Sequence, residues 1–189
     1  MENTIKLVGI SGSLRKGSFN TMLIHAVREL LPEGMELEIV SFADVPVYNA
    51  DHDTPAAAER PESVRIFRDA LAKADAFVIA TPEYNYSIPG GLKNAIDWAS
   101  RGTDAPLNNK AVALMGATPG MWGTVRGQHA FHPIFQFLNM TTVRKPEVFI
   151  AKAGEKFDES GRLHDEATRK VIAQQLEALK KLISQLRNA

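Results

Sequence analysis

The segment I-K-L-V-G-I-S-G-S-L-R-K-G-S-F-N (5–20) decides the fold class. Its first six residues are apolar or small apart from one lysine, which is typical of a strand buried on both faces. A polar loop follows. From Asn20 to Leu31 the apolar residues recur at helical spacing, until Pro32 and Gly34 end the pattern. This order predicts the first half of a strand–helix–strand unit.

The same order continues along the chain. We expect further strands at 35–42, 76–80, 110–117 and within 143–151, and further helices at 62–73, 89–99, 124–139 and 165–187. An irregular stretch rich in Asp and Pro occupies 43–60. Strands that alternate with helices and lack hairpin signals predict a parallel sheet covered on both faces. The expected fold class is therefore α/β in three layers, and residues 1–189 are expected to form a single domain.

The composition excludes several classes of protein. The chain has 22 basic and 22 acidic side chains and no net charge, which argues against a nucleic-acid or membrane-surface binder. It has no cysteine, which excludes disulfides, thiolate metal sites and cysteine nucleophiles and fits a reducing cytoplasm. From the start MENTIKLVGI we expect no secretory signal, and no apolar run of the given sequence reaches about 18 residues. We expect a soluble cytoplasmic protein.

The loop after the first strand has the composition of a phosphate site. It contains three hydroxyls, one amide and two cations: Ser11, Ser13, Ser18, Asn20, Arg15 and Lys16. The N–H groups and dipole of a helix N-terminus attract anions, and an arginine offers a bidentate fork to phosphate. The P-loop pattern is incomplete, because Ser18 and Phe19 stand where Lys and Ser/Thr are required, and G-x-G-x-x-G is absent. A phosphomonoester site is expected; a plain turn with Ser18 as N-cap is the alternative.

The loop after the third strand is suited to a planar ring. It reads T-P-E-Y-N-Y-S-I-P-G-G-L-K-N-A-I-D-W (81–98). Two prolines and the Gly90–Gly91 pair restrict its backbone, and Tyr84 and Tyr86 flank Asn85. In open parallel sheets, ligands bind beyond the carboxyl ends of the strands where strand order reverses. A phosphate on one loop and a flat ring on the other describe a mononucleotide, and a flavin fits.

Together, G-S-L-R-K-G-S-F-N (12–20) and P-E-Y-N-Y-S-I-P-G-G-L-K-N-A-I-D-W (82–98) closely resemble the NADPH-dependent FMN reductase family, nearest to its bacterial chromate and quinone reductases. The resemblance extends through the element order over 5–150. It implies a flavodoxin-like fold with sheet order 2-1-3-4-5, non-covalent FMN, NAD(P)H as co-substrate, and a homodimer that often pairs into a tetramer. The implied activity passes a hydride from NAD(P)H via FMN to quinones, chromate, azo or nitro compounds, or free flavin.

The resemblance also implies which residues hold FMN. The phosphate would be held by Ser13, Arg15, Ser18, Phe19, Asn20 and Thr21. The ring would be lined by Pro82, Glu83, Tyr84, Asn85, Thr118 and Gly120, with backbone N–H groups as the main donors. Pro119 and Trp122 depart from the family pattern. The flavin carries the chemistry, so no catalytic side chain and no metal ligand is expected, and Glu83 is expected to orient rather than to catalyse.

The sequence is compatible with several alternatives. A flavodoxin-type electron carrier of the same fold is one, although carriers tend to be strongly acidic and this chain is neutral. Arg126 suits a 2′-phosphate, a partner subunit or plain solvent exposure. His129 and His132 have a spacing found in metal sites, but no H-E-x-x-H pattern accompanies them.

Overall fold

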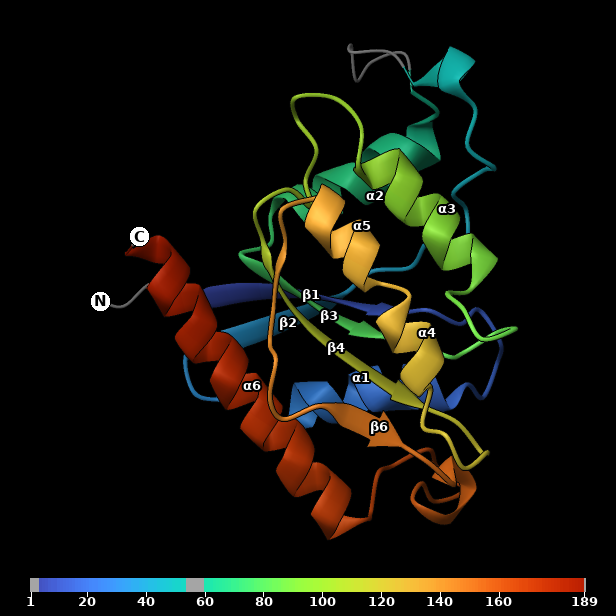
Figure 1. Cartoon of the computed structure of the whole chain (residues 1–189), viewed down its shortest axis with the longest axis vertical. Helices are drawn as coiled ribbons and strands as arrows, with labels where there is room; N and C mark the ends of the chain where they lie inside the picture. Colours follow the sequence, from blue (N-terminus) through green and yellow to red (C-terminus); the bar gives the residue numbers. More distant parts are fainter. Residues whose placement is uncertain (1–3, 54–59, 189) are drawn as a thin grey trace.

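The computed structural model describes residues 4–53 and 60–188, which form a parallel sheet between two layers of helices (Figure 1). The strands are β1 (Ile5–Ser11), β2 (Met35–Ile39), β3 (Ala76–Ala80), β4 (Ala111–Ala117), β5 (Thr141–Thr142) and β6 (Val148–Ile150). The α-helices are α1 (Phe19–Glu29), α2 (Glu62–Ala72), α3 (Gly90–Ala99), α4 (Val125–His129), α5 (His132–Phe137) and α6 (Glu166–Arg187). Single 3-10 turns occur at Ala50–His52 and Ala153–Glu155. Part of the expected irregular stretch, 54–59, lies outside the described residues.

The strand order is β2-β1-β3-β4-β5, all neighbours are parallel, and β6 pairs with β4 beyond β5. The predicted order 2-1-3-4-5 is confirmed. Every residue of β3 is buried, as expected for a central strand covered on both faces. Strand order reverses between β1 and β3, so the loops that follow these two strands leave the sheet side by side.

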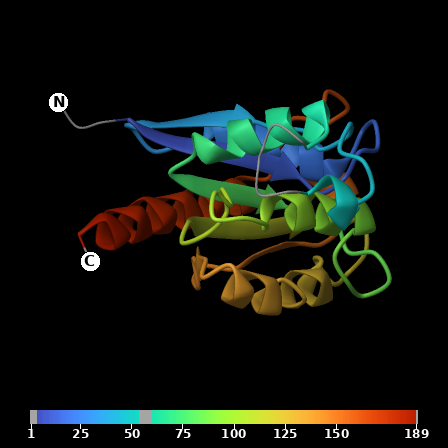
Figure 2. The same ribbon diagram turned by 90° about the horizontal axis from the view of Figure 1, so that it is seen from above.

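Each face of the sheet has its own core. Because side chains alternate along a strand, Leu7 faces the core beneath α1 and α6, whereas Val8 and Ile10 face the core beneath α2, α3 and α5. Figure 2 shows these helices on opposite sides of the sheet. No helix within 4–53 and 60–188 has both the length and the apolar character needed to cross a membrane.

Two expected elements are shorter or broken. The second strand ends at Ile39 rather than at 42, and the chain then turns so that Phe42 packs beneath Gly91. The helix expected over 124–139 is two helices, α4 and α5. Pro133 lacks the N–H that would bond back to His129 in a continuous helix, so the helix ends and restarts there.

The fifth strand is split. The strand expected within 143–151 is present as β6, whereas β5 lies before this range and was not predicted. Val143 N–H still donates to Val112 O of β4 at 3.0 Å, and residues 144–147 then leave the sheet. Gln175 of α6 reaches into the gap, where its Nε2 donates to Leu114 O (3.1 Å) and Pro146 O (2.9 Å). A side chain from the covering helix thus replaces part of the strand ladder.

Candidate functional site

Three loops meet at the carboxyl ends of β1, β3 and β4, and close backbone contacts bring them together. A β-carbon on Gly12 would lie 3.0 Å from both Pro82 Cδ and Leu92 Cδ2, tighter than ordinary van der Waals contact. A β-carbon on Gly116, near the end of β4, would lie 2.4 Å from Thr81 O. Glycine is therefore needed at both positions for the loops to approach one another.

The loop after β1 presents donors at the start of α1. Ser18 is the N-cap, and its Oγ accepts from Asn20 N–H at 3.2 Å, which leaves the hydroxyl hydrogen free to donate outward. Within the described residues, the N–H groups of Phe19 and Thr21 have no protein acceptor. Arg15 is exposed, and no described carboxylate lies within ion-pair distance of it. Free N–H groups, a hydroxyl and a cation are the donors that an FMN phosphate requires.

Other hydroxyls of this loop hold its shape. Ser11 Oγ accepts from Ser13 N–H at 3.3 Å and lies 2.9 Å from Thr21 Oγ1. Ser13 Oγ in turn accepts from Arg15 N–H at 3.3 Å. In this structure Ser13 thus bonds to the loop backbone and Thr21 contacts the Ser11 side chain, and their contact with phosphate stays a prediction.

Asn20 has a structural role that the sequence did not reveal. Its Nδ2 donates to Ala117 O and its Oδ1 accepts from Ala117 N–H, both at 2.9 Å, and the residue is 3% exposed. The amide thus fastens the first turn of α1 to the last residue of β4. A phosphate in the loop would find most of this amide already bonded, so the expected contact of Asn20 with phosphate also stays a prediction.

The loop after β3 forms a tight hairpin. Tyr84 N–H donates to Ser87 O (3.1 Å) and Ser87 N–H to Tyr84 O (2.9 Å), with Asn85 and Tyr86 between them at φ +50° and +62°. This turn leaves both tyrosine side chains exposed. It also uses the N–H of Tyr84, which was expected to face the ring. The N–H groups of Glu83 and Asn85 have no acceptor among the described residues.

The loop after β4 is anchored to β6. Thr118 N–H donates to Ile150 O at 2.9 Å, and Lys152 N–H donates to Gly120 O at 3.0 Å. Gly120 N–H has one long local bond, 3.3 Å, to Thr118 Oγ1. Of the two residues expected here, Gly120 therefore keeps the more available N–H, and Thr118 offers its hydroxyl rather than its backbone.

Glu83 joins the second loop to α4. Its Oε2 accepts from the N–H groups of Arg126 (2.9 Å) and Gly127 (3.0 Å), and its side chain is 13% exposed. A β-carbon on Gly127 would lie 3.2 Å from Glu83 Cβ, so glycine permits this approach. The carboxylate is thus bonded to the backbone of α4 and does not project into the site between the loops. Its expected role, to orient rather than to catalyse, stays a prediction.

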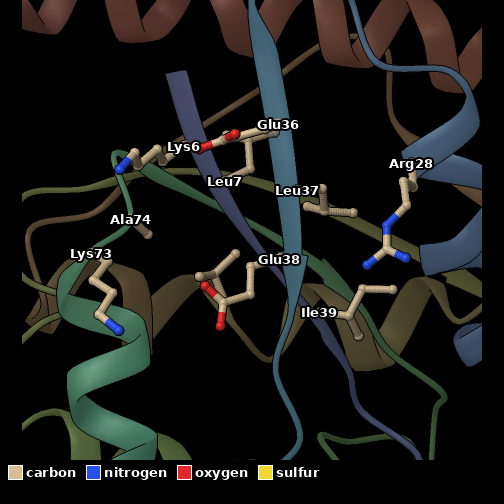
Figure 3. A pocket seen from close by; sticks show the side chains of 10 residues that line it. Lys6, Leu7, Arg28, Glu36, Leu37, Glu38, Ile39, Lys73 and Ala74 are labelled. Carbon is tan, nitrogen blue, oxygen red and sulfur yellow. The ribbon is translucent and has the colours of Figure 1, made fainter. Parts of the chain in front are cut away.

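Two other features lie apart from these loops. Figure 3 shows a groove of about 500 Å³ along the edge strand β2, where Glu36 and Glu38 alternate with Leu37. Charged side chains along an unpaired edge strand oppose its pairing with another sheet. This protective role explains the charges of the groove, and no ligand is needed to explain them. The rings of His129 and His132 are 5.5 Å apart, and within 4–53 and 60–188 no cluster of three His, Asp or Glu side chains suits a metal ion.

Comparison with known proteins identifies the family. Residues 5–155 match the model of the NADPH-dependent FMN reductase family. The chain is 44% identical to an NAD(P)H-dependent FMN reductase of Pseudomonas aeruginosa PAO1 (99% of this chain, all of the relative) and 38% identical to a quinone reductase of Escherichia coli K12 (99% and 100%). Its fold matches FerB, a flavoenzyme NAD(P)H:(acceptor) oxidoreductase from Paracoccus denitrificans, with a TM-score of 0.85 and 31% identity over 96% of this chain and 98% of that one. The converging loops, the flavodoxin-like sheet and these relatives agree: the chain belongs to the NADPH-dependent FMN reductase family.

Proposed function

We propose that the chain, as a single domain, is an NAD(P)H-dependent FMN oxidoreductase that reduces quinones and other small acceptors. The observation that carries this proposal is the meeting of a loop rich in phosphate donors with a rigid, tyrosine-flanked loop at the point where strand order reverses. In the overall reaction NAD(P)H, a proton and a quinone give NAD(P)⁺ and a hydroquinone. When bound, FMN supplies the hydride chemistry.

The loop after β1 would hold the phosphate group of FMN. Arg15 supplies the charge, and the N–H groups of Phe19 and Thr21 supply neutral donors within the positive end of the α1 dipole. Ser18 donates its hydroxyl hydrogen. Asn20 holds this turn against β4, so that the phosphate loop and the loop after β4 keep a fixed distance.

The loops after β3 and β4 would orient the ring. The backbone N–H groups of Glu83, Asn85 and Gly120 would face the ring. There they would stabilise the negative charge of the reduced ring. Tyr84 is 50% exposed and offers a flat surface at the open side. An open site with flat walls accepts planar molecules of many kinds, which agrees with a broad set of acceptors.

We also propose a homodimer that uses the surface between α3 and α5. Phe137 is 71% exposed beside a groove of about 280 Å³ whose lining includes Ile96 and Ile134. The groove is also lined by Lys93, Asp97 and Arg101, and a large exposed ring with charged residues at its rim is a common feature of interfaces. Light scattering should give a dimer or tetramer for the wild type and a smaller species for Phe137→Asp. A wild-type monomer would contradict this proposal.

Turnover distinguishes an enzyme from an electron carrier. The FMN-loaded protein is mixed anaerobically with NADPH, or with NADH, and a large excess of water-soluble quinone. A reductase should consume many equivalents of quinone with no second protein present. Arg15→Ala should bind FMN about tenfold or more weakly and lose activity when FMN is limiting, whereas Arg65→Ala, which removes an exposed charge on α2, should keep both. Quinone reduction that requires an added reductase would favour the carrier.

A further inference from the structure

Arg126 contacts two exposed aromatic rings beside the candidate flavin site. Its guanidinium carbon lies 4.2 Å from the ring centroid of Tyr86 and 4.8 Å from that of Trp122. Tyr86 is 70% and Trp122 65% exposed, and the Arg126 side chain is 37% exposed. A cation–π contact attracts the guanidinium charge to the face of an aromatic ring and supplies no oxygen acceptor for its N–H groups. The N–H donors in the plane of the group are therefore still available to a ligand.

The backbone on both sides is held in an uncommon conformation. Tyr86 has φ +62°, and Thr124, two residues before Arg126, has φ +65°. Residues other than glycine rarely adopt the left-handed backbone region. The resulting backbone strain persists only where the surrounding structure requires it. Here these two turns present the aromatic ring and the guanidinium on the same surface, although they belong to loops about forty residues apart.

Glu83 holds the backbone of Arg126 but leaves most N–H donors of its guanidinium without a partner. The carboxylate bonds to the Arg126 backbone N–H at 2.9 Å, but its contact with Nη1 is long, at 3.5 Å. Within the described residues, no other carboxylate lies within 4 Å of the Arg126 guanidinium. A guanidinium has five N–H donors, so most of them have no strong protein partner. Because Glu83 belongs to the loop expected to line the flavin ring, the unfilled donors lie next to the place where a reducing co-substrate must enter.

We propose that Arg126 binds the 2′-phosphate of NADPH, with Trp122 and Tyr86 as flat surfaces beside the adenosine. This inference rests on the proposed function in taking NAD(P)H as co-substrate, and it narrows the preference to NADPH. A planar fork of donors matches a phosphate, and exposed aromatic rings stack with a purine. NADH has no 2′-phosphate and would gain nothing from this charge. Arg126 is thus a specificity-determining residue, and Glu83 is the residue that positions it.

Binding of adenosine nucleotides tests the proposal without turnover. Affinities of adenosine 2′,5′-bisphosphate and of 5′-AMP for the FMN-loaded protein are measured by calorimetry for the wild type, Arg126→Ala, Arg126→Lys and Arg144→Ala. Arg144 is an exposed arginine outside the three loops and serves as the matched charge control. Arg126→Ala should weaken the bisphosphate about tenfold or more and leave 5′-AMP unchanged. Arg126→Lys should fall between, since it keeps the charge but loses the fork, and Arg144→Ala should match the wild type.

Kinetics provide the second readout. For Arg126→Ala, KM for NADPH should rise about tenfold while KM for NADH and both kcat values stay the same. An equal loss for both nucleotides would place the phosphate contact at the pyrophosphate and overturn the proposal. Unchanged affinities would overturn it as well, and a change in association state alone would assign Arg126 to contact with a second copy of the chain. If neither NADH nor NADPH reduces the FMN of the wild type, the proposed function itself fails, whatever the bisphosphate result.

Discussion

Replacing Asn20 with alanine would disconnect α1 from the end of β4. The side chain makes two hydrogen bonds of 2.9 Å to Ala117, and the residue is 3% exposed, so water cannot readily replace them. Each bond contributes about 1–1.5 kcal/mol, and a backbone group left buried and unpaired can cost up to about 3 kcal/mol. The expected loss in unfolding free energy is therefore about 2–4 kcal/mol.

Urea unfolding of the FMN-free protein measures this loss without a contribution from ligand binding. Asn108→Ala is the control, because Asn108 is exposed and its side chain makes no hydrogen bond with the described residues; its change should stay within about 0.5 kcal/mol. Asn20→Asp should also destabilise, since the new carboxylate would face Ala117 O without a proton to donate. A loss below about 1 kcal/mol for Asn20→Ala would refute the view that this amide fixes the distance between the loops.

Three further predictions follow from charged groups. Arg15→Ala should weaken FMN binding about tenfold or more, because a charge-assisted hydrogen bond is worth about 1.5–3 kcal/mol; fluorescence titration measures it, and an unchanged affinity removes Arg15 from the phosphate site. Arg60→Ala should cost about 3–5 kcal/mol in urea unfolding, because it leaves Asp53 buried without its partner at 2.7 Å, and a loss under about 1 kcal/mol would contradict this. Burial opposes ionisation of Asp75, but a backbone N–H of β1 and the Arg187 guanidinium hold the pKa of Asp75 below its usual value. Its contribution to stability is then full above about pH 4 and is lost as the pH falls further, so Asp75→Asn should flatten the acid side of the stability profile, and an unaltered profile would refute the assignment.

The parallel α/β class was predictable because strand-like and helix-like segments alternate along the chain, whereas the order 2-1-3-4-5 was implied by the resemblance to the family. The split of the fifth strand was not predictable, because it depends on Gln175, a residue of α6 that enters the gap from the far end of the chain. The break between α4 and α5 has a signal in the sequence, Pro133, which the expectation of one helix over 124–139 did not take into account.

The positions of the site loops were predictable, but some roles of their side chains were not. Asn20 bonds to a residue 97 positions away, and Glu83 to the backbone of α4 more than forty positions away. Neither pairing follows from spacing or composition. The positive φ of Tyr86 was also hidden, since Asn-Tyr is not a usual pair for such a turn. Contacts of this kind arise from the packing of loops, which only the folded chain reveals.

The visible spectrum of the FMN-loaded protein under anaerobic conditions tests the central claim most directly. FMN should bind at about one per chain, its absorption band should bleach on addition of NADPH, and the band should return when a quinone is added. A protein that binds no FMN, or whose bound flavin keeps its band with both NADPH and NADH, would contradict the account.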